Sequence, residues 1–241
     1  MAASISPDWK VLAHSPLETL SDNLWRVTGA LPGMSLQRTM TIARRKDGAL
    51  VVHSAIAVDE KTLAQILALG TPGFLLVPNQ GHRLDAPAYK QRFPGLRVYT
   101  PRGGRAKVAE VVAVDGAYED FPHDDTVRLE MLHGVKDLEG AMIVTSRDGV
   151  TVVLNDAVMN MDKKRDPLGW FFTTVMGSAP GPRVSRFGKL MFVKDQAALR
   201  RDLERYAELP SLTRLVVAHE KVAHGADAPA ALRRAATYLR A

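Results

Sequence analysis

The chain has 241 residues, a formal net charge of +6 and no cysteine. Without cysteine it cannot form disulfides, thiolate metal sites or a cysteine nucleophile, which agrees with a cytoplasmic location. The start of the chain lacks the basic residues and the continuous apolar core of a signal peptide. No later segment approaches the roughly 20 apolar residues of a membrane span. We therefore expect a cytoplasmic protein with no membrane partner.

The basic residues are scattered along the chain. They form pairs and triplets such as Arg44-Arg45-Lys46 and Lys163-Lys164-Arg165 rather than one long tract, a pattern typical of solvated faces and not of a nucleic-acid interface. Hydrophobic residues make up 46% of the chain, which is enough to bury a full core. No Pro/Gly/Ser-rich linker separates two halves, so we expect a single domain over residues 1–241.

The first part of the chain predicts antiparallel strands. Residues 23–28 alternate apolar and polar positions, and residues 36–43 are a second, less regular candidate. The turn signal Asp47-Gly48 leads from there into the apolar run 49–52. These three runs predict a β-meander.

From Asp59 the apolar period changes to that of a helix. Leu63, Ile66 and Leu67 fall on one predicted helical face, and Gly70 is placed to end the helix. A strand, a short helix and another strand follow, at residues 74–77, 87–93 and 96–99.

The second half of the chain repeats this order. Four apolar runs predict strands, at residues 111–114, 126–132, 141–146 and 150–154. The irregular residues 162–188 are rich in proline and predict either a functional loop or a mobile segment. Asp195 then predicts a helix N-cap, residues 215–218 a strand, and Asp227 the start of a last helix. Two such halves predict an α/β fold, a four-layer α/β/β/α sandwich with the sheets face to face.

Four of the apolar runs end in polar side chains. His53 follows the run 49–52, and Asn79 and His82 follow the next strand. Asp156 and His219 follow the last strand of the second meander and the final strand. Because strand ends at one edge of a sheet share a cleft, we expect these five side chains to converge there.

The order of these motifs resembles the metallo-β-lactamase superfamily over nearly the whole chain. Asp156 matches the position of the family's metal-bridging aspartate, which ends a later strand. His219 matches the histidine that ends the family's final strand. The resemblance implies a sandwich of metallo-β-lactamase type and metal-dependent hydrolysis as the family's chemistry.

The family's first motif, His-x-His-x-Asp-His, is not preserved. Asn79 stands where its first histidine is expected, and His82 is the one imidazole within residues 78–86. His133 or Asp137 could substitute for the family's middle histidine. The pattern Pro-Asn-x-x-His is similar to an uncharacterised branch of the superfamily in which metal ligands are replaced.

These residues leave two functions open. A dinuclear zinc site needs about six histidine or carboxylate ligands, whereas the resemblance supplies His82, Asp156 and His219. The chain is then either a protein without the dinuclear zinc site that binds a small molecule or partner, or a hydrolase with one weakly bound zinc or other divalent ion. In the second case residues 162–188 would cover an ester, thioester, lactone or phosphodiester substrate.

Overall fold

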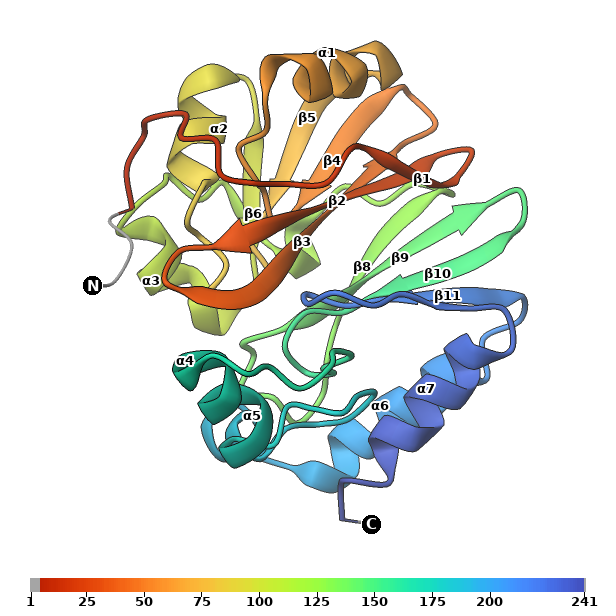
Figure 1. Cartoon of the computed structure of the whole chain (residues 1–241). Coiled ribbons are helices and arrows are strands. Elements are labelled where there is room, and N and C mark those ends of the chain that lie inside the picture. Colours follow the sequence, from red (N-terminus) through yellow and green to blue (C-terminus); the bar gives the residue numbers. More distant parts are fainter. Residues whose placement is uncertain (1–4, 241) are drawn as a thin grey trace.

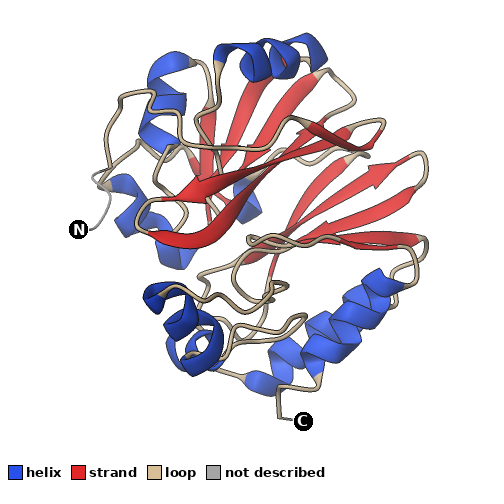
Figure 2. Cartoon of the chain, in the orientation of Figure 1, coloured by secondary structure: helices blue, strands red, loops and turns tan. Residues whose placement is uncertain are grey.

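The computed structural model describes residues 5–240 and contains two β-sheets packed face to face (Figure 1). One sheet has seven strands and the other has five. Helices cover the outer face of each sheet (Figure 2). The expected four-layer α/β/β/α sandwich is confirmed.

The seven-stranded sheet begins antiparallel and continues parallel. Its strands lie side by side in chain order. The first four pair antiparallel through short turns, and each later strand pairs parallel with the one before it. The strands are β1 (Glu18–Ser21), β2 (Leu24–Leu31), β3 (Met34–Arg44), β4 (Ala49–His53), β5 (Thr71–Leu76), β6 (Arg97–Thr100) and β7 (Gly116–Ala117).

Helix α1 (Glu60–Leu69) connects β4 to β5 and covers the outer face of this sheet. Asp59 caps it by accepting a hydrogen bond from the Thr62 backbone at 2.7 Å. Leu63 and Ile66 are buried against the sheet, but Leu67 is 42% exposed. Leu67 fits the predicted apolar face but lies at its rim, because the apolar stripe of a helix on one sheet face is narrow. The same face also carries α2 (Ala86–Arg92) and α3 (Arg105–Ala109).

The prediction of a strand at residues 111–114 is wrong. The backbone N–H groups of Val111 and Val112 both donate to the Val108 carbonyl, so the chain continues the last turn of α3 instead of extending. Val112 is buried among the residues under α1 and α2. Burial explains the apolar run, and apolar runs of this length do not distinguish strand from helix end.

The five-stranded sheet combines a meander with a returning strand. Its order is β12-β11-β10-β9-β8, with β10 and β11 parallel and the other pairs antiparallel. The strands are β8 (Val127–Met131), β9 (Gly140–Ser146), β10 (Gly149–Val153), β11 (Leu212–Val216) and β12 (Ala223–His224).

Two long helices, α6 (Gln196–Ala207) and α7 (Asp227–Ala236), cover the outer face of this second sheet (Figure 1). Asp195 caps α6 as expected, accepting from the Ala198 backbone at 3.0 Å. Leu199, Leu203 and Leu232 are fully buried between these helices and the sheet. Among the helices of residues 5–240, none combines the length and the apolar character needed to cross a membrane.

The inner faces of the two sheets share one apolar core. Val51 and Leu76 from the first sheet meet Met142, Val153 and Val216 from the second, and none is more than 1% exposed. This layer fixes the two sheets relative to each other. The ends of β4, β5, β10 and β11 therefore keep fixed positions in the sandwich.

The irregular segment of the sequence contains short helical turns. These are α4 (Pro167–Trp170), a π-helical turn (Phe171–Val175) and α5 (Arg186–Met191), which lie side by side at one end of the molecule (Figure 1). Asp166 anchors α4 to the β2–β3 hairpin through a hydrogen bond from Ser35. Ser185 caps α5 by accepting from the Gly188 backbone at 2.8 Å. The segment is thus tied to the strands that border the site.

Candidate functional site

The candidate site lies where four strands end at one edge of the sandwich. β4 and β5 are parallel neighbours in one sheet, and β10 and β11 are parallel neighbours in the other. The main chain of β3 joins the two sheets here, because the Thr39 N–H donates to the Ala218 carbonyl at 2.8 Å. The loops that follow these strands therefore face one another.

Asp156 is at the centre of the site. One carboxylate oxygen, Oδ2, accepts a hydrogen bond from the Asn79 amide at 2.8 Å. The other, Oδ1, lies 3.3 Å from His82 Nε2 and 3.5 Å from His219 Nε2. The structure thus brings together four of the five residues that the strand ends predicted.

The outer nitrogen of each histidine ring has its own partner. His82 Nδ1 lies 2.9 Å from the Ser54 hydroxyl, and His219 Nδ1 donates to the Gln37 carbonyl at 2.6 Å. Such bonds orient an imidazole so that its other nitrogen faces a metal ion. The sequence did not single out Gln37. Gln37 acts through its main chain, which leaves no signal in residue type.

The spacing of His82, Asp156 and His219 fits one metal ion. Their candidate ligand atoms all lie within 4.8 Å of one another. A tetrahedral ion with bonds of about 2.1 Å places its ligands about 3.4 Å apart, close to the 3.3 and 3.5 Å between each imidazole and the carboxylate. Three protein ligands leave a coordination position for water or substrate, as in catalytic zinc sites.

Asn79 shapes the loop that carries His82. Its side-chain oxygen accepts from the Gly81 backbone at 2.7 Å, and its carbonyl accepts from the His82 backbone at 3.1 Å. These bonds close a tight turn directly after β5. Asn79 therefore both forms the turn and, through its amide, holds Asp156.

The buried charges of the site depend on one another. Burial alone would raise the pKa of Asp156, but the charge and hydrogen bonds of His82 and His219 hold it well below its ordinary value. Burial likewise opposes a charge on His219, but the hydrogen bond and charge of Asp156 outweigh it and raise the pKa of His219. Asp156 is thus an anion that favours a proton or a cation between the two rings.

Glu139 supports Asp156 from the main-chain side, a contact that the sequence did not reveal. Its carboxyl group is buried and accepts from the backbone N–H groups of Asn155, Asp156 and Ala157 at 2.8 to 3.0 Å. Burial and the neighbouring Asp156 raise the pKa of Glu139 to about 8. Glu139 therefore holds the loop after β10 in the conformation that presents Asp156.

His53 lies at the end of β4 but makes no bond to the others. It is 2% exposed, and its Nε2 has no hydrogen-bond partner within residues 5–240. Burial first, and then the charge of nearby His82, lower its pKa to about 3. His53 is a neutral neighbour of the cluster.

The two possible substitutes for the family's middle histidine lie outside the cluster. His133 has an exposed side chain whose Nδ1 lies 3.1 Å from Asp202 of α6. Asp137 is exposed, in a turn where its φ is 55°. Neither belongs to the group of possible ligands, because the turns after β8 direct them toward α6 and solvent.

An apolar pocket of about 170 Å³ opens over the cluster. His82, Asp156 and His219 line it together with Ser178. Its other lining residues come from the β2–β3 hairpin, the loop after β10 and residues 172–192: Leu31, Met34, Leu36, Met159, Met161, Phe172, Phe187 and Phe192. The polar cluster is therefore reached through an aliphatic and aromatic cavity.

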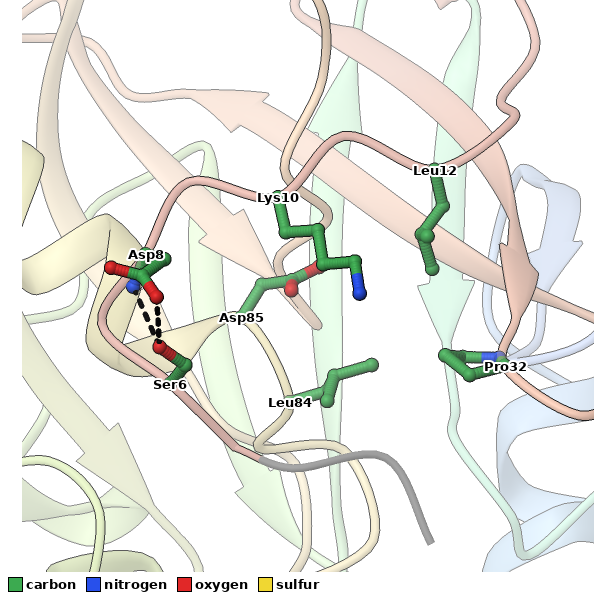
Figure 3. Close-up of a pocket in the computed structure, with 7 residues that line it drawn as sticks. All are labelled: Ser6, Asp8, Lys10, Leu12, Pro32, Leu84 and Asp85. Atoms are coloured by element: carbon green, nitrogen blue, oxygen red, sulfur yellow. Dashed lines mark hydrogen bonds between the residues drawn. The ribbon is translucent and has the colours of Figure 1, made fainter. Parts of the chain in front are cut away.

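A second cavity, of about 280 Å³, lies under the N-terminal segment (Figure 3). Lys10, Leu84 and Asp85 are among its lining residues, and none of the five strand-end residues is. Asp85 instead forms a buried ion pair with Arg38 at 2.7 Å and accepts from the Ala57 backbone at 3.0 Å. These contacts give Asp85 a structural role in fixing the loop after β4.

Solved structures of metallo-β-lactamases are similar to this chain over nearly its whole length. The enzyme from Pontibacter korlensis is 12% identical, with a TM-score of 0.60, and the match covers 92% of this chain and 98% of that one. The DIM-1 metallo-β-lactamase exposed to ceftazidime is 12% identical, with a TM-score of 0.62 and coverage of 95% and 99%. The enzyme from Erythrobacter litoralis, with β-mercaptoethanol in its active site, is 13% identical, with a TM-score of 0.61 and coverage of 92% and 96%.

These similarities confirm the expected metallo-β-lactamase fold. No protein-family model and no curated protein sequence matches the chain. Identities of 12 to 13% establish the fold alone, because one fold supports many functions. Evidence for the function therefore comes from the residues of the candidate site.

Proposed function

We propose that the chain hydrolyses a small, largely apolar molecule with one divalent metal ion held by His82, Asp156 and His219. The observation that carries this proposal is the spacing of three candidate ligand atoms at the base of an apolar pocket. A divalent ion there would polarise a substrate carbonyl and lower the pKa of a coordinated water. The three residues fit one ion, not two, so the site is simpler than a dinuclear one.

The supporting residues divide the work of positioning the site. Ser54 and Gln37 orient the two rings through their outer nitrogens. Asn79 and Glu139 hold Asp156, one through its side chain and one through its backbone. Because these groups are in place before a substrate arrives, little reorganisation is needed on binding.

The pocket lining indicates the substrate class. Among the described residues that line it, none is a lysine or arginine, and eight of the twelve are leucine, methionine or phenylalanine. An anionic phosphodiester would lose its hydration there without gaining a cationic partner other than the metal ion. A neutral carboxylic ester, thioester or lactone with a short apolar group suits this lining better.

The test combines metal binding with ester hydrolysis. Tag-free protein is dialysed against zinc and assayed with p-nitrophenyl esters of increasing acyl length, alongside His82→Ala, Asp156→Ala and the control His224→Ala, an exposed histidine on β12. We expect the wild type and the control to bind one zinc ion per chain and to hydrolyse the esters only when zinc is present. The two site variants should neither bind zinc at this site nor hydrolyse the esters. Hydrolysis that survives both site substitutions would refute the proposal.

A metal-independent binding protein is the second candidate. It is favoured by the bonds among the polar groups themselves, since Asn79 and both imidazoles already contact the Asp156 carboxylate. Such a cluster can be stable as a hydrogen-bonded network. If this reading is right, a fluorescent apolar probe binds equally well before and after chelation, and zinc adds no hydrolysis.

A further inference from the structure

Residues 162–194 expose an unusual number of large apolar side chains. Nine large hydrophobic residues are exposed among those the structure describes, and six of them belong to this segment. Trp170 is 51% exposed and Leu190 is 76% exposed. The six, which we call the apolar patch, are Leu168, Trp170, Phe171, Val175, Leu190 and Met191.

The same segment carries most of the net positive charge. Its seven basic and two acidic residues leave a net charge of +5, out of +6 for the whole chain. Four of the basic side chains are exposed and form no ion pair within residues 5–240: Lys163, Arg165, Arg186 and Lys194. The segment therefore exposes both large apolar side chains and unpaired cations.

A row of aromatic rings connects the patch to the pocket. Exposed Phe171 contacts Phe172 edge to face, with ring centroids 6.1 Å apart. Phe172 contacts Phe187 at 6.4 Å, and Phe187 contacts Phe192 at 5.8 Å. The last three rings line the pocket over the polar cluster. An apolar surface thus continues from solvent to the site.

We propose that residues 162–194 dock the protein on an anionic lipid surface. Exposed Trp, Phe and Leu side chains would enter the boundary between headgroups and acyl chains, while the unpaired Lys and Arg side chains contact anionic headgroups. The aromatic row would then face the lipid, so that an apolar molecule dissolved there reaches the pocket without crossing water.

The positive charge of the segment favours an anionic lipid surface, and not a second copy of the chain, as its binding partner. A symmetric dimer through the apolar patch would place two segments of net charge +5 against each other, which opposes association. An anionic bilayer has the opposite sign and attracts each nearby cation.

Docking on a surface does not require a membrane span. The sequence led us to expect no membrane partner because no segment is long and apolar enough to cross, but an interfacial contact needs only a short apolar face with cations. Lipid docking does not depend on the proposed hydrolysis. The variant Asp156→Ala should therefore abolish metal binding and leave lipid binding unchanged.

Vesicle sedimentation tests the proposal directly. The full chain is mixed with vesicles of phosphatidylcholine alone or of phosphatidylcholine with phosphatidylglycerol, at low and at high salt. We expect binding to the anionic vesicles that weakens with salt, and little binding to the neutral ones. Replacing Lys163 or Arg165 by Ala should lower the partition about fivefold for each cation, whereas Arg201→Ala, an exposed cation on α6, should have little effect.

A matched pair of leucines tests the apolar contribution. Leu168 and Leu67 are each 42% exposed, but Leu67 lies on α1 and belongs to no part of the segment. Leu168→Glu should lower vesicle binding at least tenfold, and Leu67→Glu by much less. Circular dichroism confirms that each variant is folded.

Several results would overturn the proposal. These are vesicle binding that is absent, that is equal on neutral and anionic lipid, or that is equally reduced by the two leucine variants. A dimer in solution that Leu168→Glu disperses would assign the patch to self-association instead.

The fluorescence of Trp170 provides an independent signal. Insertion into lipid should shift its emission to shorter wavelength, and Trp170→Phe should remove that shift.

Discussion

The carboxylate of Asp156 contacts three polar side chains, those of Asn79, His82 and His219. Its two oxygens face the Asn79 amide on one side and the His82 and His219 rings on the other. At these distances the negative charge attracts a cation to the space between the two imidazole rings. The properties of the cluster should therefore change most when this one residue is replaced.

Replacing Asp156 by Asn should lower the pKa of His219. The wild-type pKa is raised because the hydrogen bond and charge of Asp156 outweigh the effect of burial, and burial alone would lower it. Histidine titrations followed by NMR in metal-free protein measure the change, with exposed His224 as an internal reference. An unchanged His219 titration would mean that the contact with Asp156 does not form in solution.

Removing the Glu139 carboxyl group should disturb the loop after β10. Glu139→Ala leaves three backbone N–H groups without their acceptor, and we expect a loss of about 3 kcal/mol in the free energy of unfolding. Glu139→Gln keeps one acceptor oxygen and should lose less. Urea unfolding at pH 7 provides the measurement, and equal stability of Glu139→Ala and wild type would exclude this role.

His53 should make the folded state sensitive to acid. Burial lowers its pKa from the ordinary value of 6.5 to about 3 in the folded chain, so between these two pH values the unfolded chain binds a proton that the folded chain does not. The contribution of neutral His53 to the free energy of unfolding is therefore fully present above pH 6.5, and it is lost as the pH decreases toward 3.

The matched comparison uses His53→Leu. Between pH 7.5 and about pH 4.5, the wild type should lose about 3 kcal/mol more unfolding free energy than His53→Leu. Urea unfolding at both values tests this. Parallel losses in the two proteins would show that His53 is not the group responsible.

At the scale of single elements, the sequence predicted most strands but not every boundary. The runs at residues 49–52, 74–77 and 150–154 are strands because each is short, apolar and followed by turn residues. The run at residues 111–114 has the same composition but completes α3, and only its tertiary position makes the difference. The helical turns α4 and α5 escaped prediction because a helix of one or two turns has no readable period.

In helix α1, two leucines on the same predicted apolar face differ in how deeply they are buried. Leu63 is 2% exposed and Leu67 is 42% exposed, although both fit the predicted apolar face. Leu63→Ala should cost about 2 to 4 kcal/mol of unfolding free energy and Leu67→Ala less than about 1. Chemical denaturation of both variants checks this difference, and similar losses would contradict the position of α1 on the sheet.

At the scale of the molecule, the sandwich brings together residues that lie far apart in the chain. His82, Asp156 and His219 were recognisable because each follows an apolar run and two of them match a family pattern. Glu139 precedes a strand and was not recognisable, because its contacts depend on how β9 lies beside the loop after β10. The apolar pocket was also hidden, since it is built from residues 31–36, His82, residues 156–192 and His219, which are far apart in the chain.

A cluster with three candidate ligands should hold less metal than a dinuclear site. We expect tag-free protein purified without added metal to contain less than one zinc ion per chain, and to hydrolyse standard lactam substrates poorly. Elemental analysis and a lactam assay measure both. Two zinc ions per chain would restore a dinuclear reading of the site.

Anomalous X-ray diffraction at the zinc edge, from crystals soaked in zinc, shows directly whether the three side chains hold one ion. We expect one anomalous peak, within bonding distance of His82, Asp156 and His219 and facing the apolar pocket. Crystals of Asp156→Ala should lose that peak. Two peaks in the pocket, or no peak between the three side chains at saturating zinc, would contradict this expectation.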